Sequence, residues 1–161
     1  MANIQLVLHN IRSTHNVGSI FRTAEGFGIT RIILSGYTPY PTYPGDTRLP
    51  HLAEKITNQI HKTALGAETM VPFIYMSEPN FSILRRDGYT IIGLEQDEKS
   101  VRLQDYRVPE NIALLLGEEV EGISTNLRRE CSILLEIPMK GKKESFNVSV
   151  AAGIALYQLT L

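Results

Sequence analysis

The sequence predicts an α/β protein whose mostly parallel sheet is flanked by helices. Short apolar runs alternate with segments of helical periodicity along all 161 residues, and this alternation is typical of parallel strands joined by crossover helices. The run "NIALLLGEE" at 111–119 is continuously apolar up to its glycine, as in a strand covered on both faces. No internal repeat, linker or low-complexity tract interrupts the sequence, so residues 1–161 are expected to form one domain.

The first elements follow from local patterns. The run "IQLVLHNI" at 4–11 predicts a strand, and "RIILSG" at 31–36 predicts the next one. Between them, "NVGSIFRTAEGFG" at 16–28 predicts a helix with Asn16 as its N-cap and Gly28 just past its end.

The middle of the chain begins with a loop. Residues 37–50 hold four prolines and three tyrosines, and prolines at this density exclude a regular element. Periodicity then predicts a helix at 51–66, a strand at 71–76 and a helix at 78–87.

The last elements are predicted in the same way. Strands are expected at 89–96, 111–119 and 132–139, and helices at 123–131 and 145–161. The final helix leaves almost no polar face, so it is expected to be buried all round. One side would pack on the sheet, and the other would meet either a second subunit or loops of its own chain.

Composition places the chain in a broad class. Hydrophobic residues make up 43% and charged residues 20%, as in ordinary globular proteins. A single cysteine, Cys131, excludes an internal disulfide and fits a reducing compartment. The N-terminus lacks the basic region and apolar run of a signal peptide, and no stretch is long enough to span a membrane. A cytoplasmic location is therefore expected. The net charge of −1 favours no class of partner.

The helix at 16–28 has an unusual polar face. Its apolar stripe is opposite Arg22, which stands among small residues, two of them glycines. The apolar residues are Val17, Ile20, Phe21, Ala24 and Phe27, and the small ones are Gly18, Ser19, Thr23 and Gly26. Because a solvated face usually carries Lys, Glu and Gln, we expect another body to approach this face closely.

Three predicted loops follow strands, where ligands of α/β sheets collect. They are "GLEQ", "LGEEVEGIS" and "IPMKGKKESFN". Gly117 would allow a ligand close to the backbone, and two glutamates beside it suit a cationic centre better than a phosphate. The lysine of a phosphate-binding P-loop is missing. An ordinary strand–turn–helix explains this stretch equally well.

The sequence shows no motif for a metal site or for a serine nucleophile. The four histidines lack metal-ligand spacing with one another or with Cys131, and no G-x-S-x-G elbow is present. Basic clusters occur at 139–143, at 128–129 and around Arg12. Taken alone, such clusters are usually solvated surface.

Three segments together resemble a known family. "NVGSIFRTAEGFG", "LLLGEEVEGIS" and "IPMKGKKESFNVSVAAG" are similar to the three ordered motifs of the SpoU (TrmH-like) branch of the SPOUT RNA methyltransferases. The resemblance covers residues 3–161 and leaves no room for the extra RNA-binding domain of many members. It therefore implies the short single-domain form.

The resemblance implies a deep trefoil knot at about 89–161, which is rare among folds, and a homodimer. It also implies S-adenosylmethionine (AdoMet), without a metal, as cofactor and transfer of its methyl to a ribose 2′-hydroxyl of RNA. The near-neutral charge and single domain favour tRNA over rRNA as substrate. The alternatives are a non-catalytic RNA-binding module with the same fold, and a flavodoxin-like nucleotide-binding protein.

Site residues are carried over by motif match. The resemblance implies catalytic roles for Arg22, Asn16, Glu119, Ser145 and Asn147. The cofactor would be lined by Leu94, Leu116, Gly117, Ile137, Met139 and Phe146, of which Phe146 replaces the leucine usual in the family. RNA contacts are expected from Arg12, Lys140, Lys142 and Lys143.

Overall fold

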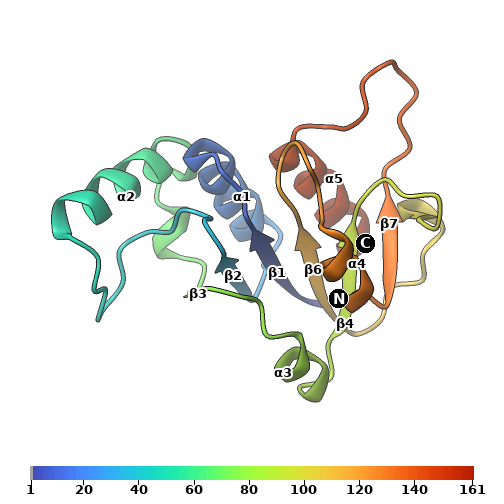
Figure 1. Ribbon diagram of the computed structural model, residues 1–161, viewed down its shortest axis with the longest axis horizontal. Coiled ribbons are helices and arrows are strands. Elements are labelled where there is room, and N and C mark those ends of the chain that lie inside the picture. Colours follow the sequence, from blue (N-terminus) through green and yellow to red (C-terminus); the bar gives the residue numbers. More distant parts are fainter. Residues whose placement is uncertain (1) are drawn as a thin grey trace.

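The computed structural model describes residues 2–161, and within this range the chain forms one seven-stranded sheet. Its strands are β1 (Asn3–His9), β2 (Arg31–Ser35), β3 (Phe73–Met76), β4 (Thr90–Leu94), β5 (Val101–Arg102), β6 (Asn111–Leu116) and β7 (Ile133–Glu136). The spatial order is β3-β2-β1-β6-β4-β7-β5, and every pair is parallel (Figure 1). The predicted α/β fold with a parallel sheet is confirmed.

Helices cover both faces of this sheet (Figure 1). They are α1 (Thr14–Gly26), α2 (Pro50–Ala64), α3 (Phe81–Arg86), α4 (Thr125–Glu130) and α5 (Val148–Thr160), with short 3₁₀ turns at Ala67–Thr69 and Leu103–Asp105. The larger hydrophobic core lies between one face and α1, α2 and α5, and the smaller one between the other face, α3 and the start of α4. No helix of residues 2–161 is long and apolar enough to cross a membrane.

The burial of the central strands β1 and β6 accounts for their apolar sequences. β1 pairs with β6 in register, with Leu6 opposite Leu114 and Leu8 opposite Leu116. Side chains of both strands alternate between the two cores, so β6 is buried along almost its whole length. A strand covered on both faces needs a continuous apolar run, which is the pattern at 111–116.

Several predicted boundaries shift in the structure. β1 ends at His9, because Asn10 has a φ of 58° and turns the chain away from the sheet. α5 begins at Val148 instead of residue 145, which leaves Ser145 in the preceding loop. The two-residue strand β5 and the 3₁₀ turns are too short to show a periodic pattern and were not predicted.

The predicted N-cap of α1 was wrong. Ser13, not Asn16, is the N-cap, and its side chain accepts a hydrogen bond from Asn16 N at 3.1 Å. Asn16 therefore lies in the first turn, where its amide is free for other contacts. Gly28 follows the helix with a φ of 66°, as the prediction of the helix end required.

The small-residue face of α1 is partly explained within the chain. Gly18 is buried against α2, and a Cβ built on it would lie 2.2 Å from Ile60 O. Thr23 lies on the side facing α5, 3.7 Å from the position of a Cβ on Gly153. The expectation that these small residues admit another body is therefore met at Gly18 and Thr23 by the chain's own helices. Arg22 and Gly26 remain exposed.

Candidate active site

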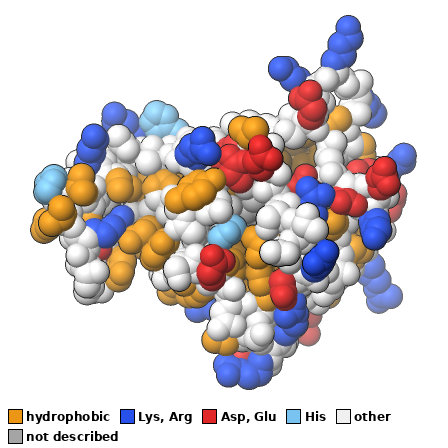
Figure 2. Space-filling model, viewed as in Figure 1, with side chains coloured by type: hydrophobic (Ala, Val, Ile, Leu, Met, Phe, Trp, Pro, Cys, Tyr) orange, Lys and Arg blue, Asp and Glu red, His pale blue; other side chains and the backbone are white. Residues whose placement is uncertain are grey.

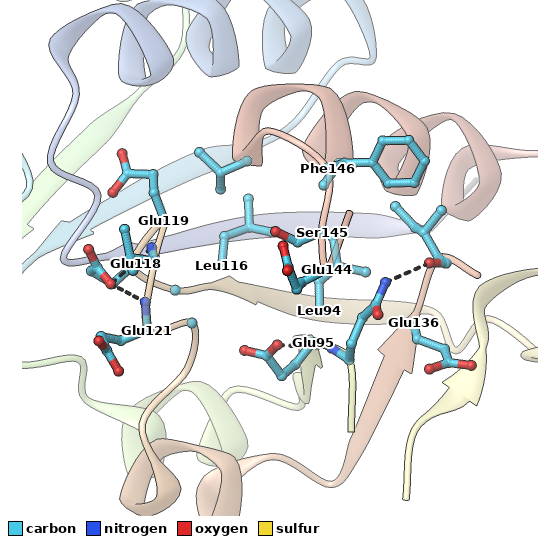
Figure 3. A pocket seen from close by; sticks show the side chains of 17 residues that line it. Leu94, Glu95, Leu116, Glu118, Glu119, Glu121, Glu136, Glu144, Ser145 and Phe146 are labelled. Atoms are coloured by element: carbon cyan, nitrogen blue, oxygen red, sulfur yellow. Dashed lines mark hydrogen bonds between the residues drawn. The ribbon is translucent and has the colours of Figure 1, made fainter. Parts of the chain in front are cut away.

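The carboxyl ends of β4, β6 and β7 open into a hollow of about 510 Å³, called here the first hollow (Figure 3). Apolar side chains lie at its base and glutamates lie around it. Figure 3 shows Glu118, Glu119 and Glu121 at one end and Phe146 at the other. This is the edge of the sheet at which the three sequence motifs were expected to supply a site.

Gly117, at the edge of this hollow, has no space for a side chain. A Cβ built on it would lie 2.6 Å from Gly122 C and from Ile123 N, so any side chain here collides with backbone. The loop folds back on itself: Gly122 N donates to Glu118 O at 2.9 Å, and the Glu118 carboxylate accepts from Val120 N at 3.0 Å and from Glu121 N. The loop at 117–122 is therefore tightly turned and held by its own hydrogen bonds.

Glu95 fixes the far end of this loop. Its carboxylate accepts a hydrogen bond from Ile123 N at 2.7 Å, and Arg128 lies 3.7 Å from it. Arg128 also donates to Ile123 O at 2.7 Å and pairs with Asp97 at 2.7 Å. Sequence reasoning did not single out Glu95, because its partners are about thirty residues away along the chain.

Glu119 joins the loop to the start of α1. Its carboxylate accepts hydrogen bonds from Arg12 N, from Ser13 N at 3.1 Å and from Asn16 Nδ2 at 3.3 Å. Burial raises the pKa of Glu119, but these hydrogen bonds outweigh it and hold the net pKa below its ordinary value. Asn147 extends this series of hydrogen bonds by donating to Asn16 Oδ1 at 3.2 Å.

All three sequence motifs therefore meet in one network. Asn16 comes from α1, Glu119 from the loop after β6, and Asn147 is the N-cap of α5, where it accepts from Ser149 N at 2.9 Å. Ser145 lines the first hollow two residues before this cap.

The comparisons with known proteins agree with this geometry. Residues 3–157 match the model of the SpoU rRNA Methylase family. The chain belongs to this family.

The relatives of this chain include enzymes that are named as methyltransferases of two kinds of RNA. The 23S rRNA (guanosine-2'-O-)-methyltransferase RlmB of Coxiella burnetii is 32% identical over 156 residues, which are 96% of this chain and 56% of the relative. The tRNA (guanosine(18)-2'-O)-methyltransferase TARBP1 of Mus musculus is 29% identical over 90% of this chain and 8% of its own length.

The fold agrees with solved structures as well. An AdoMet-bound rRNA methyltransferase from Sinorhizobium meliloti superimposes with a TM-score of 0.81 at 26% identity, covering 98% of this chain and 55% of that one. The chain thus spans about half the length of the curated RlmB relatives and of this structure.

The SpoU-type site brings together most, but not all, of the residues expected for a cofactor. Five of the six predicted lining residues surround the first hollow: Leu94, Leu116, Gly117, Ile137 and Phe146. Met139 is not among the lining residues; it lies half-buried just past the end of β7. Phe146 is 40% exposed.

Arg22 stands apart from the rest of the SpoU-type site. It is exposed on α1 and does not line the first hollow. Asn16 and Arg22 are six residues apart, so a helical rotation of about 100° per residue turns their side chains to different sides of α1. Within one copy of the chain, therefore, Arg22 is not brought to the network of Glu119, Asn16 and Asn147.

The predicted RNA-contact residues lie on the surface. Lys140, Lys142 and Lys143 are exposed on the loop between β7 and α5, which projects beyond the rest of the molecule (Figure 1). Figure 2 shows Lys and Arg side chains on this projection and acidic side chains close to the centre of the same view. Arg12 is 75% exposed and pairs with Glu118 at 3.6 Å.

Among residues 2–161, no three or more His, Cys, Asp or Glu side chains are grouped so that they could hold a metal ion.

Proposed function

We propose that this chain transfers the methyl group of AdoMet to a ribose 2′-hydroxyl of RNA. The observation that carries the proposal is the network of Asn16, Glu119 and Asn147 at the rim of the first hollow. It unites the three motifs that define the resemblance, in a chain that belongs to the SpoU family. The relatives named above act on ribose 2′-oxygens.

The residues of the first hollow fit AdoMet. Its volume of about 510 Å³ is in the range of sites for small ligands and cofactors. Leu94, Leu116, Ile137 and Phe146 offer apolar surface for an adenine, and Gly117 lets the 117–122 loop fold back tightly beside them. Glu118 and Glu121 suit the positive charges of the sulfonium and amino groups.

When bound, AdoMet supplies a methyl group activated by its sulfonium charge. The chain's task is to hold the ribose and manage the hydroxyl proton. Arg22 orients the 2′-hydroxyl and stabilises the developing oxyanion, or accepts its proton with the help of an RNA phosphate. Asn16 and Ser145 position the ribose, and Glu119 fixes Asn16 through the hydrogen bond to its amide.

The site is completed by a second copy of the chain. Arg22 is exposed and lies outside the first hollow of its own chain, which supports its acting in the partner's site. α5 buries Ala152, Ala155 and Leu156 but leaves Ile154 37% and Tyr157 58% exposed. This unpartnered apolar stripe beside α1 is the surface on which we place the homodimer contact.

RNA is the substrate class, and it would contact Arg12 and the basic loop of Lys140, Lys142 and Lys143. The preference for tRNA over rRNA has no support from the relatives, whose names include enzymes of both RNAs.

The proposal also includes the family's trefoil knot at about 89–161, a single domain over 1–161 and a cytoplasmic location. The out-of-sequence strand order β6-β4-β7 supports the knot.

Methyl transfer can be tested directly. Purified protein is incubated with isotopically labelled AdoMet and total RNA from a strain that lacks this gene, and 2′-O-methylated positions are then mapped. A labelled ribose at a defined position supports the proposal. AdoMet binding without any methylated RNA would favour the alternative of a non-catalytic RNA-binding module, and binding of FMN instead of AdoMet would favour a flavodoxin-like protein.

A further inference from the structure

A second hollow, of about 530 Å³, lies on the other side of the 117–122 loop. It opens at the carboxyl ends of β1 and β2, and His9, Tyr37 and Arg128 are among its lining residues. Gly117, Glu118, Glu121 and Gly122 line both hollows. A ligand in the second hollow would therefore be separated from the first hollow by a single loop of backbone.

Tyr37 stands exposed at this hollow on a fixed piece of backbone. Tyr37 as a whole is 52% exposed, while its N–H donates to Asn10 Oδ1 at 3.0 Å. Gly36 before it has a φ of 65°, and a Cβ there would collide with the same Asn10 oxygen. The turns after β1 and β2 therefore lock together and hold the Tyr37 backbone in one place.

Arg12 lies over the face of this ring. Its guanidinium carbon is 5.9 Å from the centre of the Tyr37 ring, and its Nη2 lies 3.6 Å from a Glu118 oxygen. Aromatic rings and arginine guanidinium planes are the surfaces on which unpaired bases stack in RNA-binding proteins.

The lining of the second hollow carries both signs of charge. The carboxylates of Glu118 and Glu121 lie there with the guanidinium groups of Arg12 and Arg128. His9 adds a hydrogen-bonding edge, with its Nδ1 2.9 Å from Ser35 Oγ, and burial lowers the pKa of this imidazole, which favours its neutral form. Carboxylates and a neutral imidazole suit the amino and imino groups of a base edge.

We propose that the second hollow binds an unpaired nucleobase of the RNA substrate, stacked on the pair formed by the Tyr37 ring and the Arg12 guanidinium that lies over it. This inference rests on the proposed function, because it takes the first hollow as the cofactor site and RNA as the substrate. The shared loop then lets one RNA segment place a ribose at the first hollow and a base in the second. The base gives the enzyme a sequence preference at or next to the methylated position.

The test compares Tyr37→Ala, Tyr37→Phe and the matched control Tyr43→Ala. Tyr43 lies in the same loop and is 39% exposed, but it does not line the second hollow. RNA binding and the KM for methylation are measured with total RNA from the deletion strain, and AdoMet binding is measured by calorimetry. Tyr37→Ala should weaken RNA binding about 5- to 100-fold, which is the usual effect of losing one stacked base. Tyr37→Phe and Tyr43→Ala should match the wild type.

The possible results separate the two proposals. Wild-type RNA affinity in Tyr37→Ala, or an equal loss in Tyr43→Ala, would overturn the stacked base while leaving methyl transfer intact. A wild-type protein that binds no AdoMet would instead overturn the proposed function, and direct RNA binding would still test the second hollow. Unchanged AdoMet affinity in Tyr37→Ala is expected as evidence that the first hollow is undisturbed.

Discussion

Asn147 Nδ2 donates a hydrogen bond to Asn16 Oδ1 at 3.2 Å, across 131 residues of sequence. Asn16 in turn donates to Glu119, so hydrogen bonds of these three side chains link α1, the loop after β6 and the start of α5. Because each of these segments borders the site, the network sets their relative positions. Removing its central acceptor should loosen all three at once.

Glu119→Gln tests this network through pH. The lowered pKa of Glu119 means that its carboxylate stabilises the fold above the ordinary glutamate pKa of about 4.3, and that this contribution is lost as the pH falls through the folded-state value. A glutamine keeps one acceptor oxygen and has no such titration. The melting temperature of Glu119→Gln should lie below that of the wild type at pH 7, and the two curves should converge as the pH falls through the lowered folded-state pKa of Glu119. Glu54→Gln, on an exposed part of α2, is the control and should follow the wild type throughout.

Gly117→Val tests the first hollow. The built Cβ already lies 2.6 Å from the Gly122 and Ile123 backbone, so a valine must displace the loop that lines the hollow. AdoMet binding measured by calorimetry should be lost. Gly141→Val places its side chain where nothing lies within 4 Å and should bind AdoMet normally. Undiminished binding by Gly117→Val would remove the 117–122 loop from the cofactor site.

Local sequence patterns predicted much of the secondary structure of this chain. Apolar runs and helical periodicity predicted the order of the main strands and helices, because those patterns reflect burial on one or both faces of a sheet. Boundaries were less certain where several polar residues compete for one role. Ser13 and Asn16 are both good N-caps, as are Ser145 and Asn147, and local sequence does not decide between them. In the structure Ser13 caps α1, which leaves Asn16 to bond Glu119, and Asn147 caps α5.

Other features have no local signal. Glu95 is important because it meets Ile123 N, and Gly18 is small because α2 crosses it; both depend on contacts between distant segments. The second hollow likewise forms from turns after β1, β2 and β6, so its residues share no motif. Family motifs named Leu94, Leu116, Gly117, Ile137 and Phe146, which line the first hollow, but the helix-face pattern did not show that α2 is the body that approaches Gly18.

The basic loop is tested by replacing Lys140, Lys142 and Lys143 with alanine. Each lysine that neutralises an RNA phosphate releases counterions, so RNA affinity should fall and the slope of its logarithm against log salt should flatten by about two. AdoMet binding should survive. The double variant Lys55→Ala and Lys62→Ala, exposed on α2, serves as the control for lost positive charge. An unchanged salt slope in the triple variant would make this loop plain solvated surface.

Assembly is tested on the exposed stripe of α5. Ile154→Asp places a charge on this stripe, where Ile154 is 37% exposed, and burying that charge in an apolar interface is costly. Light scattering should give the wild type twice its chain mass of 18.0 kDa and the variant a single chain mass. Ile83→Asp, at a 43% exposed isoleucine of α3 on the other face of the sheet, should remain dimeric. A monomeric wild type at micromolar concentration would exclude a site built from two subunits.

Arg22→Ala tests the catalytic assignment. The side chain is exposed on α1, outside the hydrophobic cores, so its removal opens no cavity and the melting temperature should stay close to that of the wild type. Cofactor affinity should also hold, because Arg22 does not line the first hollow. Single-turnover methylation should nevertheless slow by about 10²- to 10⁴-fold, as expected for loss of a positioned proton-transfer group.

Arg22→Lys separates charge from geometry. A lysine keeps the positive charge but lacks the planar fork that can hold a ribose oxygen and a phosphate together, so it should restore little of the rate. Light scattering on the same preparations checks that both variants remain dimeric, since an interface role for Arg22 would slow the reaction by separating the subunits. A dimeric Arg22→Ala with a near-normal rate would place the proton-handling group elsewhere, and the residues left at the site to take that role would be Ser145 and Glu119, both of which line the first hollow.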